Sequence, residues 1–260
     1  MRSKSIELAT GVTLDAVDRG DPDGPAVVFL PGPTDGWRSY QPVLDHLPDG
    51  LRCVAVSQRG HGASDKPVGS YRVEDFAADV PALLDALAID RATLVGHSGS
   101  CFTARRVALD HPERVHGLVL EASPSTLRGH PALAALVGSI EDPIDPAFAR
   151  AFVTDTSSAD LDDDLVEALV ADVLAVPPRV WRALFGALAD HDDLDELPGL
   201  AAPTLLVWGD ADQLVDLAMQ EDLLGRLPDA SLVVHRGAGH TPRWEDPSRF
   251  ATDVAHMVLG

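Results

Sequence analysis

The sequence contains little cysteine and no long apolar segment. Its 260 residues include two cysteines, Cys53 and Cys101, both in apolar stretches without the spacing of a metal site or a disulfide framework. We therefore expect both thiols to be small buried side chains. No run of 18 apolar residues occurs, and no apolar signal core follows the N-terminus, so we expect a cytoplasmic protein without a membrane span.

Basic residues are also scarce. The chain has 20 Lys and Arg against 41 Asp and Glu, which gives a formal net charge of −21. A field of this sign repels nucleic acid and anionic membranes, so we expect neither as a partner. The histidines lack metal-ligand spacing and no phosphate-binding loop is present, so we expect no metal and no cofactor. The expected partner is a small-molecule substrate, and a homodimer is compatible with the sequence.

Short apolar runs alternate with amphipathic stretches over much of the chain. This alternation predicts a mostly parallel sheet of eight strands flanked by helices, in the α/β class. The expected strands are residues 6–9, 12–17, 26–30, 53–57, 92–95, 116–121, 204–208 and 232–235. The expected helices are residues 39–47, 73–87, 101–109, 215–226 and 247–258.

The alternation stops between residues 124 and 200, where no strand pattern appears. This interval instead contains helical patterns at residues 132–139, 146–153, 161–176 and 179–189. A helical insertion between two strands of one sheet is typical of a lid. We therefore expect a core formed by residues 1–123 and 201–260, with residues 124–200 as a helical cap.

A serine lies at the sharp turn between the strand at 92–95 and the following helix. Only small residues fit beside such a turn, and Ser98 is flanked by Gly96, Gly99 and Ser100. The segment resembles the nucleophile elbow of the α/β-hydrolase family, Gly-x-Ser-x-Gly, with Ser100 in place of the last glycine. The resemblance implies an exposed nucleophilic hydroxyl on Ser98.

Further segments resemble the same family in the same order along nearly the whole chain. They are the stretch from residue 31 through Trp37, the loop Arg59-Gly60-His61-Gly62, the pair of aspartates in Gly209-Asp210-Ala211-Asp212, and Gly239-His240. The resemblance implies an α/β-hydrolase fold with an inserted helical cap. It also implies a serine hydrolase of the esterase or lactonase kind.

A serine hydroxyl needs a neighbouring base and a third group that orients the base. His240 lies in a glycine-rich loop after the last expected strand, where it can approach the elbow. The resemblance places the acid at Asp212, and Glu121, at the end of the strand after the elbow helix, is the alternative. We expect His97 to point away beneath Ser98 and His61 to be structural. The remaining candidates are expected at the surface or in packing: His46, His111, His130, His191 and His256.

Acyl transfer also needs hydrogen-bond donors for the oxyanion. One should be the backbone N–H of Gly99 at the start of the elbow helix. The resemblance places the other in the loop after residue 30, at Pro33, which has no N–H. A donor from Gly32 or Thr34, or the Thr34 hydroxyl, would replace it; otherwise the enzyme is slow or its reaction forms less of an oxyanion.

Apolar side chains are frequent in the expected cap, which favours an uncharged, fairly apolar ester or lactone as substrate. Trp37, Trp181 and Trp244 are candidates for the pocket wall. Two other functions stay open: a non-hydrolytic member of the family, such as a lyase, a cyclase or a cofactor-free haloperoxidase-like protein, and a catalytically silent receptor. Epoxide hydrolases and haloalkane dehalogenases of this fold need an aspartate where Ser98 stands, so neither activity is expected.

Overall fold

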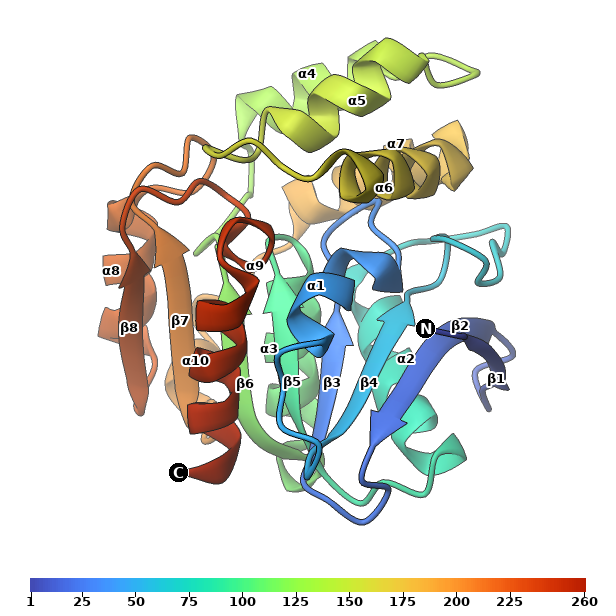
Figure 1. Ribbon diagram of the computed structural model, residues 1–260. Coiled ribbons are helices and arrows are strands. Elements are labelled where there is room, and N and C mark those ends of the chain that lie inside the picture. Colours follow the sequence, from blue (N-terminus) through green and yellow to red (C-terminus); the bar gives the residue numbers. More distant parts are fainter.

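The computed structural model describes residues 1–260 and contains one sheet of eight strands (Figure 1). The strand order is β1-β2-β4-β3-β5-β6-β7-β8. The first two strands are antiparallel to their neighbours, and all pairs from β4 to β8 are parallel. The strands are β1 Lys4–Glu7, β2 Thr13–Gly20, β3 Ala26–Leu30, β4 Arg52–Ser57, β5 Ala92–His97, β6 Val115–Glu121, β7 Thr204–Gly209 and β8 Ala230–His235. The predicted mostly parallel α/β sheet is confirmed.

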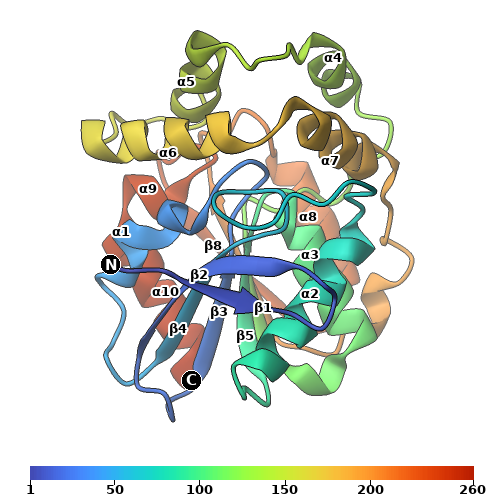
Figure 2. The ribbon, with the colours of Figure 1, turned by 90° about the vertical axis from the view of Figure 1, so that its right-hand side faces the viewer.

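Helices cover both faces of this sheet, as Figure 2 shows with the sheet between them. One face is covered by α2 Val73–Ala86, α3 Ser100–Asp110 and α8 Leu217–Arg226, and the other by α1 Gln41–Leu44, α9 Pro242–Glu245 and α10 Pro247–Leu259. Because the central strands are buried on both faces, their sequences are continuous apolar runs rather than alternating ones. Two separate hydrophobic clusters, one on each face, result from this arrangement.

Two local predictions are wrong in their bounds. The first two strands were expected at 6–9 and 12–17, but β1 ends at Glu7 because the chain turns between Leu8 and Val12. The glycine in this turn, Gly11, has a φ of +79°. The single helix expected at 39–47 is instead a 3-10 helix, Trp37–Tyr40, followed by the four-residue α1.

Four helices lie between β6 and β7 in the chain and above the carboxyl ends of the strands (Figure 1). They are α4 Pro131–Ser139, α5 Pro146–Thr154, α6 Asp163–Ala175 and α7 Pro178–Asp190, and we call them the helical layer. Each helix predicted in this interval is present within two residues of its expected ends. The layer has its own apolar cluster, in which Trp181 is fully buried. None of the helices in the protein is long and apolar enough to cross a membrane.

One buried arginine ties both ends of the helical layer to the core. Arg105 of α3 is fully buried, and its Nε lies 2.9 Å from Asp193 Oδ2, just after α7. The same guanidinium donates to the carbonyl oxygens of Pro124 at 3.0 Å and Ser125 at 3.3 Å, just after β6. A buried charge is costly unless it is paired and hydrogen-bonded, and Arg105 is both. The entry and exit of the layer are therefore held at one point.

A second contact between the layer and the core carries a less well stabilised charge. Asp172 of α6 packs against Gly36 and lies 3.7 Å from Arg38 Nη1, while its Oδ2 is buried without a donor. Burial raises the pKa of the Asp172 carboxyl from 3.8 to about 6, against the opposing effect of Arg38. The ionised carboxylate is thus disfavoured in the folded protein.

Replacing this carboxyl should stabilise the protein at alkaline pH. Because the pKa of Asp172 is higher in the folded state than in the unfolded state, its contribution to stability is full below about pH 4 and is lost as pH rises through about 6. We expect Asp172→Asn to increase the free energy of unfolding at pH 8 by about 1–3 kcal/mol, and by less at pH 5. Urea unfolding of both proteins at the two pH values measures this. Glu167→Gln, on the exposed side of the same helix, is the control. An equal gain in stability of Asp172→Asn at both pH values would contradict the prediction.

Candidate active site

Ser98 lies at the turn between β5 and α3 with a backbone conformation that is rare for residues other than glycine. Its φ is +51°. Two hydrogen bonds hold the turn: Ser98 N donates to the Glu121 carbonyl oxygen at 2.9 Å, and Cys101 N donates to the Ser98 carbonyl oxygen at 2.9 Å. A backbone conformation of this kind persists only where many surrounding contacts hold it in place, and it is common at functional sites.

The small residues beside Ser98 are required by close packing. A Cβ on Gly96 would lie 3.0 Å from the Ser100 carbonyl oxygen, and a Cβ on Gly99 would lie 2.8 Å from Leu188 and 2.9 Å from Pro33. Ser100, which stands where the family motif has glycine, uses its hydroxyl. Its Oγ donates to the Pro31 carbonyl oxygen at 2.6 Å and accepts from Gln58 Nε2 at 2.8 Å.

The histidine after β8 meets the aspartate after β7. His240 Nδ1 lies 2.8 Å from Asp212 Oδ2, and both side chains are nearly sealed from solvent. The other oxygen, Asp212 Oδ1, accepts the backbone N–H groups of Leu214 at 2.8 Å and Val215 at 3.1 Å, which fixes the carboxylate. With Nδ1 bound to the carboxylate, Nε2 is the imidazole nitrogen left for a proton transfer.

The alternative acid, Glu121, makes a different contact. It is fully buried at the end of β6, where Oε1 accepts the backbone N–H of Arg243 at 2.8 Å and Oε2 lies 3.3 Å from Arg243 Nη1. The same guanidinium reaches Asp35 Oδ2 at 2.8 Å through Nη2. Glu121 therefore partners an arginine three residues beyond His240, and Asp212 is the carboxylate bound to the imidazole.

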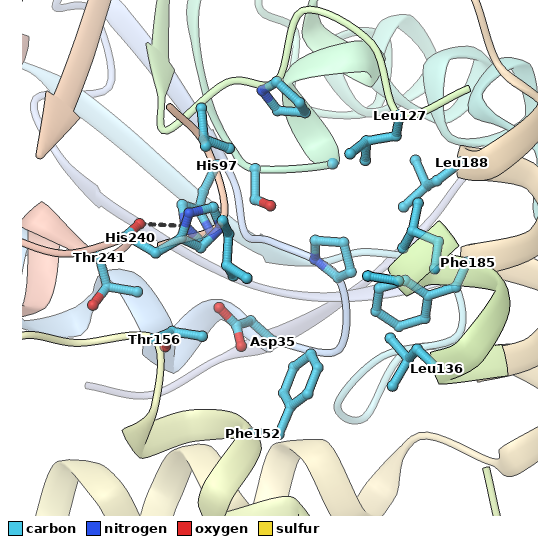
Figure 3. Close-up of a pocket in the computed structure, with 18 of the residues that line it drawn as sticks. Asp35, His97, Leu127, Leu136, Phe152, Thr156, Phe185, Leu188, His240 and Thr241 are labelled. Carbon is cyan, nitrogen blue, oxygen red and sulfur yellow. Dashed lines mark hydrogen bonds between the residues drawn. The ribbon is translucent and has the colours of Figure 1, made fainter. Parts of the chain in front are cut away.

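Two other histidines do not lie where the sequence suggested. His97 was expected to point away beneath Ser98, but it contributes to the cavity wall, its Nε2 lies 3.0 Å from the His240 carbonyl oxygen, and the two rings are 4.9 Å apart (Figure 3). Burial lowers the pKa of His97 well below its ordinary value, so the ring is neutral. His130, expected on the surface or in packing, also lines the cavity at the start of α4.

His61 has the structural place that was expected for it. Its Nδ1 is 2.8 Å from the carbonyl oxygen of Arg59, and burial lowers the pKa of the ring to about 4. The neutral imidazole packs against Phe76 with ring centroids 6.1 Å apart. His61 does not line the cavity that contains Ser98 and His240.

The loop after β3 forms a tight turn in which Asp35 N donates to the Gly32 carbonyl oxygen at 3.1 Å. Thr34 has a φ of +79° and is fully buried, and its Oγ1 is sealed off without a partner. Among the three loop candidates for an oxyanion donor, only Pro33 lines the cavity. Gly99, the fourth candidate, lines it as well, at the N-terminus of α3 where the helix dipole favours negative charge.

A cavity of about 210 Å³ lies between the elbow and the helical layer. Ser98, Gly99 and His240 are in its wall, and the rest of the wall is largely apolar (Figure 3). The apolar lining includes Leu127, Leu133, Leu136, Phe152, Phe185, Leu188 and Trp244. The cavity thus places the Ser98 hydroxyl and the His240 imidazole in the wall of a largely apolar space.

The structure places only one of the three candidate tryptophans on the cavity wall. Trp244 lines it and donates through Nε1 to the Ser39 carbonyl oxygen at 2.8 Å. Trp181 is fully buried behind the wall, with its ring 4.9 Å from Phe152 and 5.4 Å from Phe185, because a large indole on the inner side of α7 fills the core of the helical layer. Trp37 packs into the cluster on the α1 and α10 face of the sheet.

A comparison with protein families decides the family. A model of the α/β hydrolase fold matches residues 25–247. This chain belongs to the α/β-hydrolase fold family.

Individual relatives of this hydrolase differ in their reactions. Epoxide hydrolase 1 of Caenorhabditis elegans is 26% identical over 94% of this chain and 67% of the relative. 3-Oxoadipate enol-lactonase 2 of Acinetobacter baylyi is 27% identical, with coverage of 95% and 93%. Among solved structures, the esterase EaEST of Exiguobacterium antarcticum superposes with a TM-score of 0.90 at 21% identity, with full coverage of both chains. The predicted family and fold are confirmed.

Two polar residues of the hydrolase's site carry no signal in the sequence motifs that led to Ser98 and His240. Asp35 lines the cavity, and Arg243 is fully buried between Asp35 and Glu121. The available signal was that Asp35 and Arg243 are charged residues close to recognised motifs. This signal was too weak, because a charged residue in a loop is usually solvated. Only the burial of these two groups shows that they belong to the site.

The hydrogen bonds of the Ser100 hydroxyl predict that this serine, which replaces the glycine of the family motif, contributes to stability. In Ser100→Ala the bonds to Pro31 and Gln58 are lost, although Gln58 Nε2 still donates to the Pro31 carbonyl oxygen at 2.9 Å. We expect the free energy of unfolding to fall by about 1–2 kcal/mol. Chemical denaturation measures the change, and Ser231→Ala, at an exposed strand position, is the control. Equal stabilities of the two variants would contradict the role.

Proposed function

We propose that this hydrolase cleaves an uncharged, fairly apolar carboxylic ester or lactone through an acyl-enzyme on Ser98. His240 is the general base, and Asp212 orients it. The observation that carries the proposal is the 2.8 Å contact between His240 Nδ1 and Asp212 Oδ2 in a cavity whose wall also contains Ser98. A base held by a carboxylate, in a cavity that a serine also lines, is the arrangement that makes a hydroxyl nucleophilic at neutral pH.

In the proposed reaction, Ser98 Oγ attacks the carbonyl carbon while His240 Nε2 takes the hydroxyl proton. The negative charge develops on the carbonyl oxygen, where the backbone N–H of Gly99 stabilises it. The C–O bond of the ester then breaks, His240 gives its proton to the leaving alkoxide, and the acyl group stays on Ser98. Water attacks this acyl-enzyme with His240 again as base, which releases the acid and restores the serine.

The lining of the cavity supports the proposed substrate class. No Lys or Arg side chain lines it, and the helical layer contributes leucine and phenylalanine side chains. We propose that residues 124–200, which contain the helical layer, act as a cap over the cavity and bind the apolar part of the substrate. The esterase and enol-lactonase relatives support ester or lactone cleavage. Opening an epoxide in this fold would need an aspartate in place of Ser98. We therefore do not propose the reaction of the epoxide hydrolase relative for this chain.

A second candidate function rests on Pro33. Because Gly32 and Thr34 do not line the cavity, Gly99 is the one backbone oxyanion donor that we assign. A single donor suits a reaction that develops less negative charge on oxygen than ester cleavage does. A non-hydrolytic reaction of the lyase, cyclase or haloperoxidase-like kind fits this feature. Labelling of Ser98 by an organophosphonate, without turnover of any ester or lactone, would favour this candidate. Absence of both labelling and turnover would favour a silent receptor.

The triad assignment predicts different consequences for the two acids. Ser98→Ala should abolish both ester cleavage and organophosphonate labelling, and Asp212→Asn should lower kcat by about 10⁴-fold because the imidazole loses its orientation. Glu121→Gln should mainly lower thermal stability, since it weakens the buried contact with Arg243, and it should lower kcat by less than Asp212→Asn does. Steady-state kinetics with short-chain esters, together with thermal unfolding, separate these effects. A larger loss of kcat in Glu121→Gln than in Asp212→Asn would assign the acid to Glu121.

Because Pro33 lacks a backbone N–H donor, replacing it should raise the activity on esters. Pro33 carries a ring carbon where another residue carries its N–H hydrogen, and its ring lies beside Gly99. Pro33→Ala restores the N–H, so we expect kcat on esters to rise by about 10- to 100-fold, within the range typical of one oxyanion donor. Pro31→Ala, which adds an N–H at a position off the cavity wall, is the control. An unchanged kcat in a folded Pro33→Ala protein would show that a second donor already exists.

A further inference from the structure

The cavity that holds Ser98 and His240 also contains one carboxylate that the proposed chemistry does not use. Asp35 is the only Asp or Glu among the residues that line the cavity. It comes from the loop after β3, two residues beyond Pro33. Figure 3 shows its carboxylate beside the open space, with His240 and Thr156 on one side and Phe152 on the other.

The two oxygens of this carboxylate differ in their surroundings. Oδ2 accepts hydrogen bonds from Ser39 Oγ at 2.9 Å and from Arg243 Nη2 at 2.8 Å. Oδ1 receives no donor from the protein, and it is not among the polar atoms that are sealed inside. Because Asp35 lines the cavity, the access of Oδ1 is from the cavity. An acceptor with free lone pairs therefore faces a largely apolar space.

The charge around Asp35 is also unbalanced. Arg243 is the one cation in contact with it, and the same guanidinium pairs with Glu121. Burial raises the pKa of Asp35, and Arg243 acts in the opposite direction. Two carboxylates thus share one guanidinium, and no Lys or Arg lines the cavity. A ligand that donates a hydrogen bond stabilises this arrangement, whereas a ligand carboxylate would add a second negative charge in a medium that screens poorly.

We propose that Asp35 is a specificity-determining residue, which accepts a hydrogen bond from a hydroxyl group on the acyl chain of the substrate and excludes substrates that carry a carboxylate. This inference rests on the proposed function and narrows its substrate class to hydroxy-substituted esters or lactones. We place the hydroxyl on the acyl side, a few bonds from the carbonyl that Ser98 attacks, because Asp35 shares its loop with Pro33, which lies beside Gly99. Asp35 transfers no proton in the reaction.

The test uses three benzyl esters with acyl chains of similar length: benzyl butanoate, benzyl 3-hydroxybutanoate and monobenzyl succinate. Hydrolysis releases acid, so titration at constant pH gives kcat/KM for each. A hydrogen bond to a charged group discriminates by about 10- to 100-fold, so we expect the hydroxy ester to exceed the butanoate by at least about 10-fold. We expect the succinate to be the poorest of the three. Equal values for butanoate and hydroxybutanoate, or a preference for the succinate, would overturn the proposal.

The variant Asp35→Asn keeps the shape and removes the charge. We expect the ratio of hydroxybutanoate to butanoate to fall at least fivefold and the succinate to gain relative to butanoate. Asp155→Asn is the control, because Asp155 is an exposed acid next to Thr156, which lines the cavity, and its loss changes the net charge equally. A uniform loss on all three esters, with unchanged ratios, would show that Asp35 only supports Arg243. Should Asp35→Asn fail to fold, the wild-type ratios still decide the proposal.

Binding measurements separate this inference from the proposed function. The hydrolysis-resistant N-benzyl amides of the same three acids can be titrated calorimetrically into Ser98→Ala protein with and without Asp35→Asn. If no ester is turned over, the proposed function fails, but tighter binding of the hydroxy amide that depends on Asp35 would still support its role. If esters are cleaved through Ser98 and neither the ratios nor the binding depend on Asp35, the inference alone fails.

Discussion

Glu121 connects the turn that carries Ser98 to the loop that carries His240. Its carbonyl oxygen accepts the N–H of Ser98, which holds the strained turn, and its carboxylate accepts the backbone and the guanidinium of Arg243. Both side chains are sealed from solvent, so separating them would leave an uncompensated buried charge. Because Arg243 lies three residues after His240, this contact sets the distance between the two loops. The geometry of the whole site depends on this contact.

The helical layer is coupled to the same loop. The N–H of His240 donates to the carbonyl oxygen of Thr156, between α5 and α6, at 2.8 Å, and Ser158 bonds Gly237 and Glu245 on either side of the histidine. The layer therefore does more than cover the cavity, since it also fixes the backbone of the residue proposed as base. Excluding water from this space strengthens every electrostatic interaction in it.

The loop after β3 combines two unusual features within three residues. Pro33 places a ring where relatives of this fold are expected to supply an oxyanion donor, and Asp35 places a carboxylate in the cavity wall. A missing donor lowers the stabilisation of negative charge near the elbow, and an added carboxylate opposes such charge further. In the proposed reaction, both features favour a neutral, donor-bearing substrate over an anionic one. Differences in this loop can thus alter the reaction without altering the fold.

The sequence by itself determined the sheet, the flanking helices and the positions of Ser98, Asp212 and His240 at the ends of strands, because strand ends and glycine-rich turns leave local patterns. It favoured Asp212 over Glu121 only through the family resemblance, since both residues lie at or just after the ends of neighbouring strands and the direction of the side chain separates them. It misplaced Trp181, because an apolar residue on an amphipathic helix can face a cavity or a core. The burial of Asp35 and Arg243 against each other, about 200 residues apart in the chain, was decided by tertiary structure alone, since burial of a charge depends on everything that packs around it.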